Sequence, residues 1–177
     1  ARRNLELTEN LRTGEKRGSL LWVLDRTKTP MGGRLLRSWV ERPLLNPTAI
    51  RRRLTAVNEL FEGTVLRSEL IHTLHEIGDI QRLIGRCVYG TANGRDLLAL
   101  GNYFALLPRL AELLSGSRST LLKDCAAVDT LADLQQDIIS LIDDEPPFSV
   151  REGGIIRDGY STEVDELRSI MTGGKDW

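Results

Sequence analysis

The residue types that are scarce in this 177-residue chain exclude several classes of protein. It has only two cysteines, Cys87 and Cys125, which lie far apart and form no Cys-x-x-Cys pair, so a disulfide scaffold is not indicated. We expect both thiols to be buried and the compartment to be reducing. No apolar run approaches the roughly 18 residues of a membrane span, and residues 1–10 lack the apolar core of a signal peptide. The chain is therefore predicted to be cytoplasmic and to have no membrane partner.

The chain also lacks an overall excess of basic residues. Its 24 basic and 25 acidic residues give a formal net charge of −1. Proteins that bind nucleic acid on their own usually carry a basic excess, because much of their affinity comes from neutralising phosphates. Direct DNA binding by this chain is therefore not expected, and its DNA-binding residues, if it has any, are left as unknown.

The sequence motifs of common enzymes are missing as well. Residues 173–175 read Gly-Gly-Lys, but a phosphate-binding loop has a glycine where Ser169 stands and a serine or threonine where Asp176 stands. No G-x-S-x-G or H-E-x-x-H motif occurs. We predict no catalytic and no cofactor-binding residue, and expect that the chain is not an enzyme.

Helical periodicity and helix-capping residues dominate what is present. Ser19 precedes a short apolar segment, and Thr29-Pro30 and Asn46-Pro47 each pair an N-cap residue with a proline, which the first helical position tolerates. Residues 1–7 are predicted to be a weak strand or an extended lead-in. We predict an all-α class with helices at 20–24, 30–42, 47–62, 65–74, 80–88, 95–114, 121–127 and 130–142, the sixth kinked or broken at Pro108 and the last capped by Asp129.

The helix at 30–42 is predicted to be amphipathic. Met31, Leu35, Leu36, Trp39 and Val40 share one face, and arginines occupy the other. We expect Trp39 to point into the core and the arginines to face solvent. If the ring is buried, its truncation to alanine costs about 3–5 kcal/mol.

Three polar clusters leave alternatives open. The run Arg51–Arg53 fits either a phosphate site or a solvated helix face, because three consecutive positions span most of a helix's circumference. The pair His72 and His75 has the spacing of metal ligands, but no cysteine or third histidine stands nearby. The acids Asp143–Glu145, which precede a double proline, fit a divalent-metal site or a solvated helix exit. We predict no metal site at the histidine pair or at the three acids.

The segment 148–161 differs from the helical stretches around it. Its isolated apolar residues and three glycines predict extended or turn backbone, and a further helix is indicated after it. The expected fold is a multi-helix core domain, an orthogonal or irregular bundle, with a short extended segment near the C-terminus.

Several motifs together resemble the core, or lever-base, domain of the MutS family of DNA mismatch-repair ATPases. The most specific is SLL-x-x-LD-x-T-x-T-x-MG-x-R-L-L-x-x-W, which stands at Ser19–Trp39 and is followed by Pro43-Leu44. The other matching segments are NLEL at 4–7, GD-I-x-R-L-x-x-R at 78–86, R-D-L at 95–97, L-P-x-L at 107–110, EGG-x-I-x-x-GY at 152–160 and E-x-D-x-L-R at 163–168.

This resemblance implies a core domain at 1–160 and, at 161–177, the start of a lever helix that leads to a clamp domain. The implied function is structural coupling between a clamp that embraces mismatched DNA and an ATPase domain. The full-length parent is then expected to be a homodimeric DNA-dependent ATPase that uses ATP and magnesium and has a MutL-type partner, with no cofactor in this chain. The alternative is a self-contained helical protein-interaction domain unrelated to repair.

The resemblance also makes a prediction about the last helix. In the family, other helices return from the clamp and pack beside the outgoing one. We therefore expect an apolar stripe to be exposed, disordered or covered by a neighbouring copy; it consists of Val164, Leu167, Ile170 and Met171.

Overall fold

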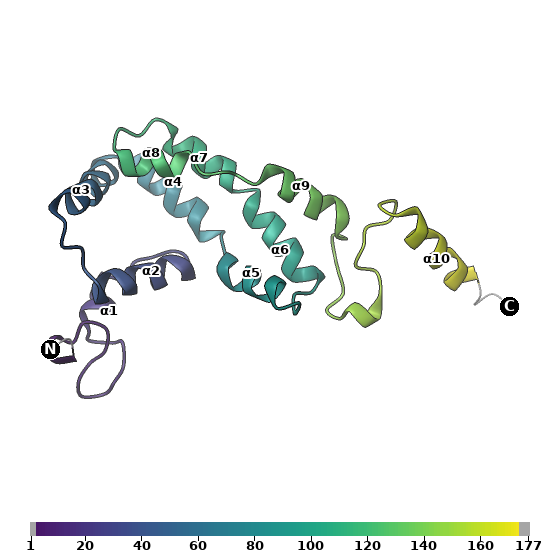
Figure 1. The fold of residues 1–177 in the computed structure, drawn as a ribbon, viewed down its shortest axis with the longest axis horizontal. Helices are drawn as coiled ribbons and strands as arrows, with labels where there is room; N and C mark the ends of the chain where they lie inside the picture. The colour runs from purple at the N-terminus through teal and green to yellow at the C-terminus, as the bar shows by residue number, and fades with distance from the viewer. Residues whose placement is uncertain (1–2, 174–177) are drawn as a thin grey trace. The chain divides into compact units, whose positions relative to one another are not determined.

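The structure is a computed structural model that describes residues 3–173 of the chain (Figure 1). The α-helices are α1 (Leu20–Leu24), α2 (Pro30–Glu41), α3 (Pro47–Glu62), α4 (Thr64–His75), α5 (Ile80–Val88), α6 (Gly94–Phe104), α7 (Leu107–Ser115), α8 (Thr120–Ala126), α9 (Ala132–Leu141) and α10 (Thr162–Gly173). Short 3₁₀ helices, η1 and η2, lie at Arg3–Leu5 and Val150–Glu152. The predicted all-α class is confirmed.

Among residues 3–173 no strand forms. The only β-type pairing there is an isolated antiparallel bridge between Ile142 and Ile156, which ties the predicted extended segment to the end of α9. The prediction of a strand or extended lead-in at residues 1–7 is wrong, because Arg3–Leu5 form η1. The two alternating leucines at 5 and 7 have no neighbouring strand with which to pair.

By its contacts the chain divides into two compact units. Unit 1 comprises the described residues within Ala1–Gln81 and Pro108–Asp129, and unit 2 those within Arg82–Leu107 and Thr130–Trp177. Residues on both sides of the predicted domain boundary at 160/161 fall in unit 2, and this boundary stays a prediction.

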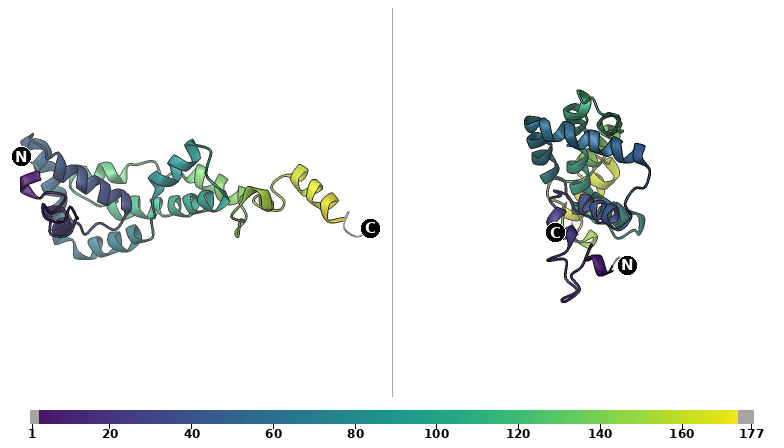
Figure 2. Two further views of the ribbon diagram at one scale, coloured as in Figure 1. Left: turned by 90° about the horizontal axis from the view of Figure 1, so that it is seen from below. Right: turned by 90° about the vertical axis from the view of Figure 1, so that its left-hand side faces the viewer.

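In unit 1, α3 packs against α4 and α8 (Figures 1 and 2). The core cluster consists of Ala56, Leu70, Leu114 and Leu122, one residue from each of α3, α4, α7 and α8. A carboxylate adds a polar tie: Glu59 of α3 accepts from the backbone N–H groups of Arg118 (2.6 Å) and Ser119 (2.7 Å), just before α8 begins. This tie lowers the pKa of Glu59.

In unit 2, α6 and α9 form the main helix pair. Gly101 lets them approach, because a Cβ at that position would lie 2.9 Å from Ile138 Cγ2. The start of α6 carries a capping box, in which the side chains of Asn93 and Asp96 each accept a hydrogen bond from the backbone N–H of the other residue. Asp96 also accepts from Arg86 of α5 at 2.7 Å, so two helices are joined at this cap.

Pro108 has the predicted effect, since α6 ends at Phe104 and α7 starts at Leu107. Taken as one helical stretch, Gly94–Ser115 is long and apolar enough by length and composition alone to cross a membrane, and 22% of its 18-residue apolar window is buried. Four charged residues, Arg95, Asp96, Arg109 and Glu112, lie within it, and such side chains are costly in hydrocarbon. On this finding alone the stretch is weak evidence for a span.

Three other expectations are wrong. Cys87 and Cys125 are exposed rather than buried, because each lies on the outer side of its helix. Asp129 does not begin the helix of α9, whose N-cap is Leu131 in a left-handed conformation with φ of 52°. Trp39 is 37% exposed, and α2 has no fully buried residue. The Gly-Gly-Lys run and the end of the predicted lever helix extend past residue 173 and so lie outside the described residues.

Candidate interaction surfaces

The predicted signature stretch folds into α1, a tight turn and α2, and Asp25 organises the turn. Its Oδ1 accepts from Thr27 Oγ1 at 2.6 Å and from the Thr27 backbone N–H at 3.1 Å. Its Oδ2 forms an ion pair with Lys16 Nζ. The hydrogen bond from Lys16, followed by that from Thr27, lowers the pKa of Asp25 from 3.8 to about 2. The carboxylate therefore stays ionised at neutral pH and fixes the two chain segments on either side of α1.

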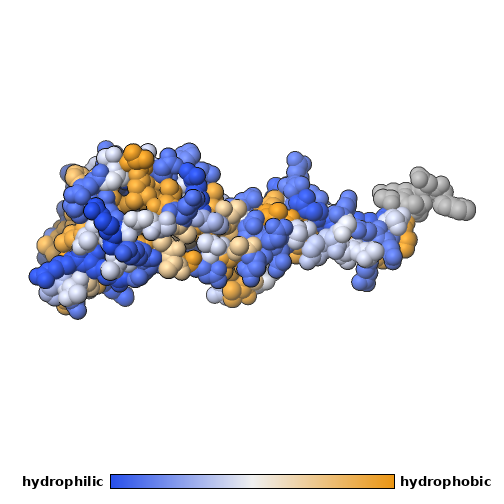
Figure 3. All heavy atoms as spheres, turned by 90° about the horizontal axis from the view of Figure 1, so that it is seen from above, coloured by the Kyte–Doolittle hydropathy of each residue, from blue (hydrophilic) through white to orange (hydrophobic). Residues whose placement is uncertain are grey.

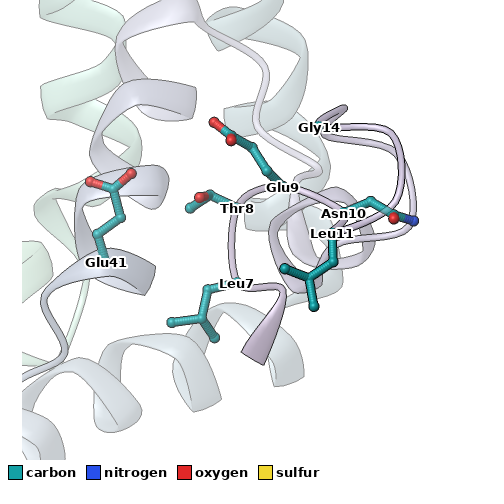
Figure 4. A pocket seen from close by; sticks show the side chains of 7 residues that line it. All are labelled: Leu7, Thr8, Glu9, Asn10, Leu11, Gly14 and Glu41. Carbon is teal, nitrogen blue, oxygen red and sulfur yellow. The ribbon is translucent and has the colours of Figure 1, made fainter. Parts of the chain in front are cut away.

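A cavity of about 340 Å³ lies between the N-terminal loop and the end of α2. Figure 4 shows Leu7, Thr8 and Glu41 around it, while the Asn10 side chain points away on the far side. Arg37 bridges the two acids of the wall, at 2.8 Å from Glu41 and 3.5 Å from Glu9. Both carboxylates of the wall are therefore engaged by one guanidinium.

Arg34 connects α2 to the start of α5. Its guanidinium donates to both oxygens of Asp79, at 2.7 and 2.8 Å, and to Gln81 Oε1, at 2.8 and 3.1 Å. The hydrogen bonds that Arg34 donates to the Asp79 carboxylate raise the pKa of Arg34. Two parallel bonds from one planar group fix orientation as well as distance, so this pair aligns two motifs that lie 45 residues apart.

The three arginines at 51–53 are directed to different places. Arg53 lies over the Trp39 ring, 3.7 Å from its centroid, and Arg52 pairs with Asp124 of α8. Arg51 is exposed. The structure therefore does not bring the three cations together around one anion, and it uses two of them to hold α3 against α2 and α8.

The other two predicted clusters also have structural partners. His72 lies 3.5 Å from Glu76, one turn along α4. Asp144 receives two hydrogen bonds from Arg157, at 2.6 and 3.0 Å, and this guanidinium lowers its pKa. Within the described part of the chain, no three His, Cys, Asp or Glu side chains gather as metal ligands.

Unit 2 carries an apolar groove of about 720 Å³ beside α10. Leu167, Ile170 and Met171 are 57%, 68% and 74% exposed, as predicted, whereas Val164 is half-buried. An orange patch next to the grey atoms marks the described end of this helix in Figure 3. The apolar residues that line the groove are Val150, Ile155, Ile156, Val164, Leu167 and Met171.

Basic residues are concentrated in the first part of the sequence, which the net charge of the whole chain does not reveal. Residues 1–53 contain 13 basic and 5 acidic residues, whereas residues 54–177 contain 11 basic and 20 acidic ones. Six of the basic side chains in the first segment are exposed and, within the described residues, have no carboxylate partner: Arg12, Arg17, Arg26, Lys28, Arg42 and Arg51. Counting charge by segment would have found this surface from the sequence.

Comparisons with known proteins agree with the motifs. Residues 1–172 match the family described as MutS domain III. The chain is 49% identical to the DNA mismatch repair protein MutS of Ruminiclostridium cellulolyticum and 47% identical to that of Desulforamulus reducens. Each comparison covers 100% of this chain and 20% of the relative, so the chain spans about a fifth of the length of these proteins.

Proposed function

Because this chain belongs to the MutS domain III family, we propose that it is the structural coupling module of a DNA mismatch repair protein. In this role it links a clamp that embraces mismatched DNA to an ATPase domain. The module itself is non-catalytic. ATP hydrolysis with magnesium, formation of a homodimer, cytoplasmic location and recruitment of a MutL-type partner belong to the full-length parent.

The exposed apolar face of α10 is the observation that carries the coupling role. Large apolar side chains on one stripe of a helix, beside an apolar groove, are characteristic of a helix that packs against further protein. A helix that packed only within its own unit would bury this apolar stripe there. The face therefore supports a structural role within a larger assembly.

Stiffness of the surrounding unit is the second requirement for coupling. Near the middle of α10, Arg168 donates to the Ile156 carbonyl at 2.7 Å, and Ile156 is bridged to Ile142 at the end of α9. A displacement of α10 is thereby passed to α9 and, through the close contact at Gly101, to α6. Packed helices that move as bodies are the usual carriers of such displacements.

The proposal is tested in a full-length MutS relative that carries the equivalent of Arg168→Ala. Arg168 joins α10 to the 156 segment and touches neither DNA nor nucleotide in the proposed role. We expect mismatch binding and basal ATPase activity to be retained, while the stimulation of ATPase by mismatched DNA falls at least several-fold.

The matched control is Arg151→Ala, an exposed arginine of the same unit that makes no side-chain ion pair within the described residues. It should leave all three activities unchanged. If the Arg168 variant retains full stimulation, or if it loses mismatch binding and basal turnover together, coupling through α10 is refuted.

A further inference from the structure

The coupling role assigns no DNA contact to this chain, but the N-terminal segment has the electrostatic character of a polyanion-binding surface. From residue 12 to residue 28 there are five basic and two acidic residues. We propose that this segment binds the phosphate backbone of duplex DNA without sequence preference, through Arg12, Arg17, Arg26 and Lys28. We call these four residues the basic collar.

The turn around Asp25 brings the basic collar together. Lys16 and Thr27 both bond to the Asp25 carboxylate, and Ser19, which is 1% exposed, bonds to the Lys16 carbonyl through Oγ at 2.6 Å. Arg17, Arg26 and Lys28 are each the immediate chain neighbour of one of the residues in this cluster, about 3.8 Å away along the chain. Residues that lie up to 11 positions apart are therefore held in one small region.

Arg12 is carried by the adjoining loop, which is itself closed by hydrogen bonds. Asn10 N–H donates to the Glu15 carbonyl at 2.8 Å, and the Gly14 N–H donates to the Asn10 carbonyl at 2.9 Å. The Arg12 backbone N–H donates to Asn10 Oδ1 at 2.7 Å. The loop therefore presents Arg12 on a defined turn rather than on a free chain end.

The acidic groups of this region do not neutralise the basic collar. Asp25 is paired with Lys16, and Glu15, the other acid of residues 12–28, forms no ion pair within the described residues. The acidic residues after position 53 that the structure describes also form no ion pair with the four collar side chains. Among the described residues, no carboxylate forms an ion pair with these four side chains, which leaves these cations available to an external polyanion.

Duplex DNA fits this surface better than an acidic protein does. DNA offers one phosphate per roughly 1.7 Å of helix axis, so a cluster of long, exposed cations on turns meets several phosphates in many orientations. An acidic protein surface needs carboxylates placed to match each cation. The collar side chains lie on loops, without the rigid planar pairing that Arg34 shows with Asp79, and this adaptable arrangement favours a regular backbone.

The test is fluorescence anisotropy of a fully paired duplex of about 30 base pairs, titrated with the 177-residue chain at about 50 mM and about 200 mM salt. The wild type should bind at low salt and weaken steeply as salt rises. The variant Arg17→Gln/Arg26→Gln removes two phosphate contacts. It should bind at least tenfold more weakly at low salt, and the slope of log K against log salt should become shallower by about 2.

The matched control is Lys123→Gln/Arg151→Gln, which removes the same charge from two exposed residues in the acidic part of the chain. It should bind within twofold of the wild type. Circular dichroism of each variant checks that helix content is unchanged.

Three results would overturn the proposal: no binding by the wild type at about 50 mM salt, equal weakening in the control, or displacement of the duplex by polyglutamate at equal charge concentration. The last result would instead identify an acidic protein as the partner. All three would leave the coupling role untouched, because that role is measured in the parent's ATPase response.

Discussion

The close approach of α6 and α9 at Gly101 gives the sharpest prediction for the fold. Gly101 and Gly85 both lie inside helices, but their surroundings differ. A Cβ at Gly101 would lie 2.9 Å from Ile138 Cγ2 and 3.0 Å from Ile139 Cδ1, whereas a Cβ at Gly85 would meet nothing within 4 Å. The same substitution therefore tests two environments.

The magnitude follows from two opposing contributions. Replacing a helical glycine by alanine stabilises a helix by about 0.8–1 kcal/mol, and this gain applies at both positions. At Gly101 the added methyl group must displace Ile138 Cγ2, which is attached directly to the branched Cβ and cannot swing away alone. Overpacking of this kind costs about 1–3 kcal/mol. We expect Gly85→Ala to stabilise by up to about 1 kcal/mol and Gly101→Ala to be about 1–3 kcal/mol less stable than Gly85→Ala.

The assay is urea unfolding followed by far-ultraviolet circular dichroism, which reports on helices in both units. A double-mutant cycle adds a direct test of the contact. Ile138→Ala removes the obstructing methyl group, so Gly101→Ala should cost about 1 kcal/mol less in that background than in the wild type. Equal stabilisation by Gly101→Ala and Gly85→Ala, together with additive effects in the cycle, would refute the packing of α6 on α9.

The remaining predictions concern unit 1 and the thiols. Trp39→Ala should lower the free energy of unfolding by about 1–2 kcal/mol rather than 3–5, because the ring is 37% exposed. A double-mutant cycle with Arg53→Ala, measured by urea unfolding, should show a coupling energy of about 0.5–1 kcal/mol. Zero coupling would contradict the stacking of Arg53 on Trp39. Asp25, with its pKa lowered to about 2, contributes stability that is fully present above pH 3.8 and is lost as the pH falls toward 2. Asp25→Asn should therefore be about 1 kcal/mol less stable than the wild type at pH 7, reduced for solvent screening, and urea titrations should show this difference shrinking between pH 5 and pH 2; a constant difference would refute the ion-pair origin. Cys87 and Cys125 are exposed, so both should react with a thiol reagent in the native state within seconds to minutes, and protection of either until denaturant is added would show that it is buried.

Locally encoded features could be predicted well from the sequence. Ser19, Thr29 and Asn46 all act as N-caps, accepting from backbone N–H groups two or three residues ahead. Pro108 likewise predicts the interruption between α6 and α7. These features depend on a few consecutive residues, because a cap or a proline acts on the backbone of its own helical turn. The ordered motifs, spread from residue 4 to residue 168, were specific enough to indicate the family.

Features that depend on partners far along the chain were not predictable in this way. Periodicity placed Trp39 on an apolar face, but only the position of Arg53, 14 residues later, decided that the ring stacks with a cation and stays partly exposed. The two cysteines lie in amphipathic helices whose outer sides the pattern could not distinguish from the inner ones. The helix α9 starts later than predicted, because Leu131 adopts a left-handed conformation and ends the preceding loop.

The sequence by itself determined the helical class, the caps at Ser19, Thr29 and Asn46 and the family, because these follow from short-range backbone hydrogen bonding and from residue order. The tertiary structure decided which side chains are buried, that Arg52 and Arg53 serve packing, and that the turn at Asp25 gathers cations from both sides of α1. Burial and ion pairing depend on which residues are neighbours in space, and the sequence specifies those neighbours only through the fold.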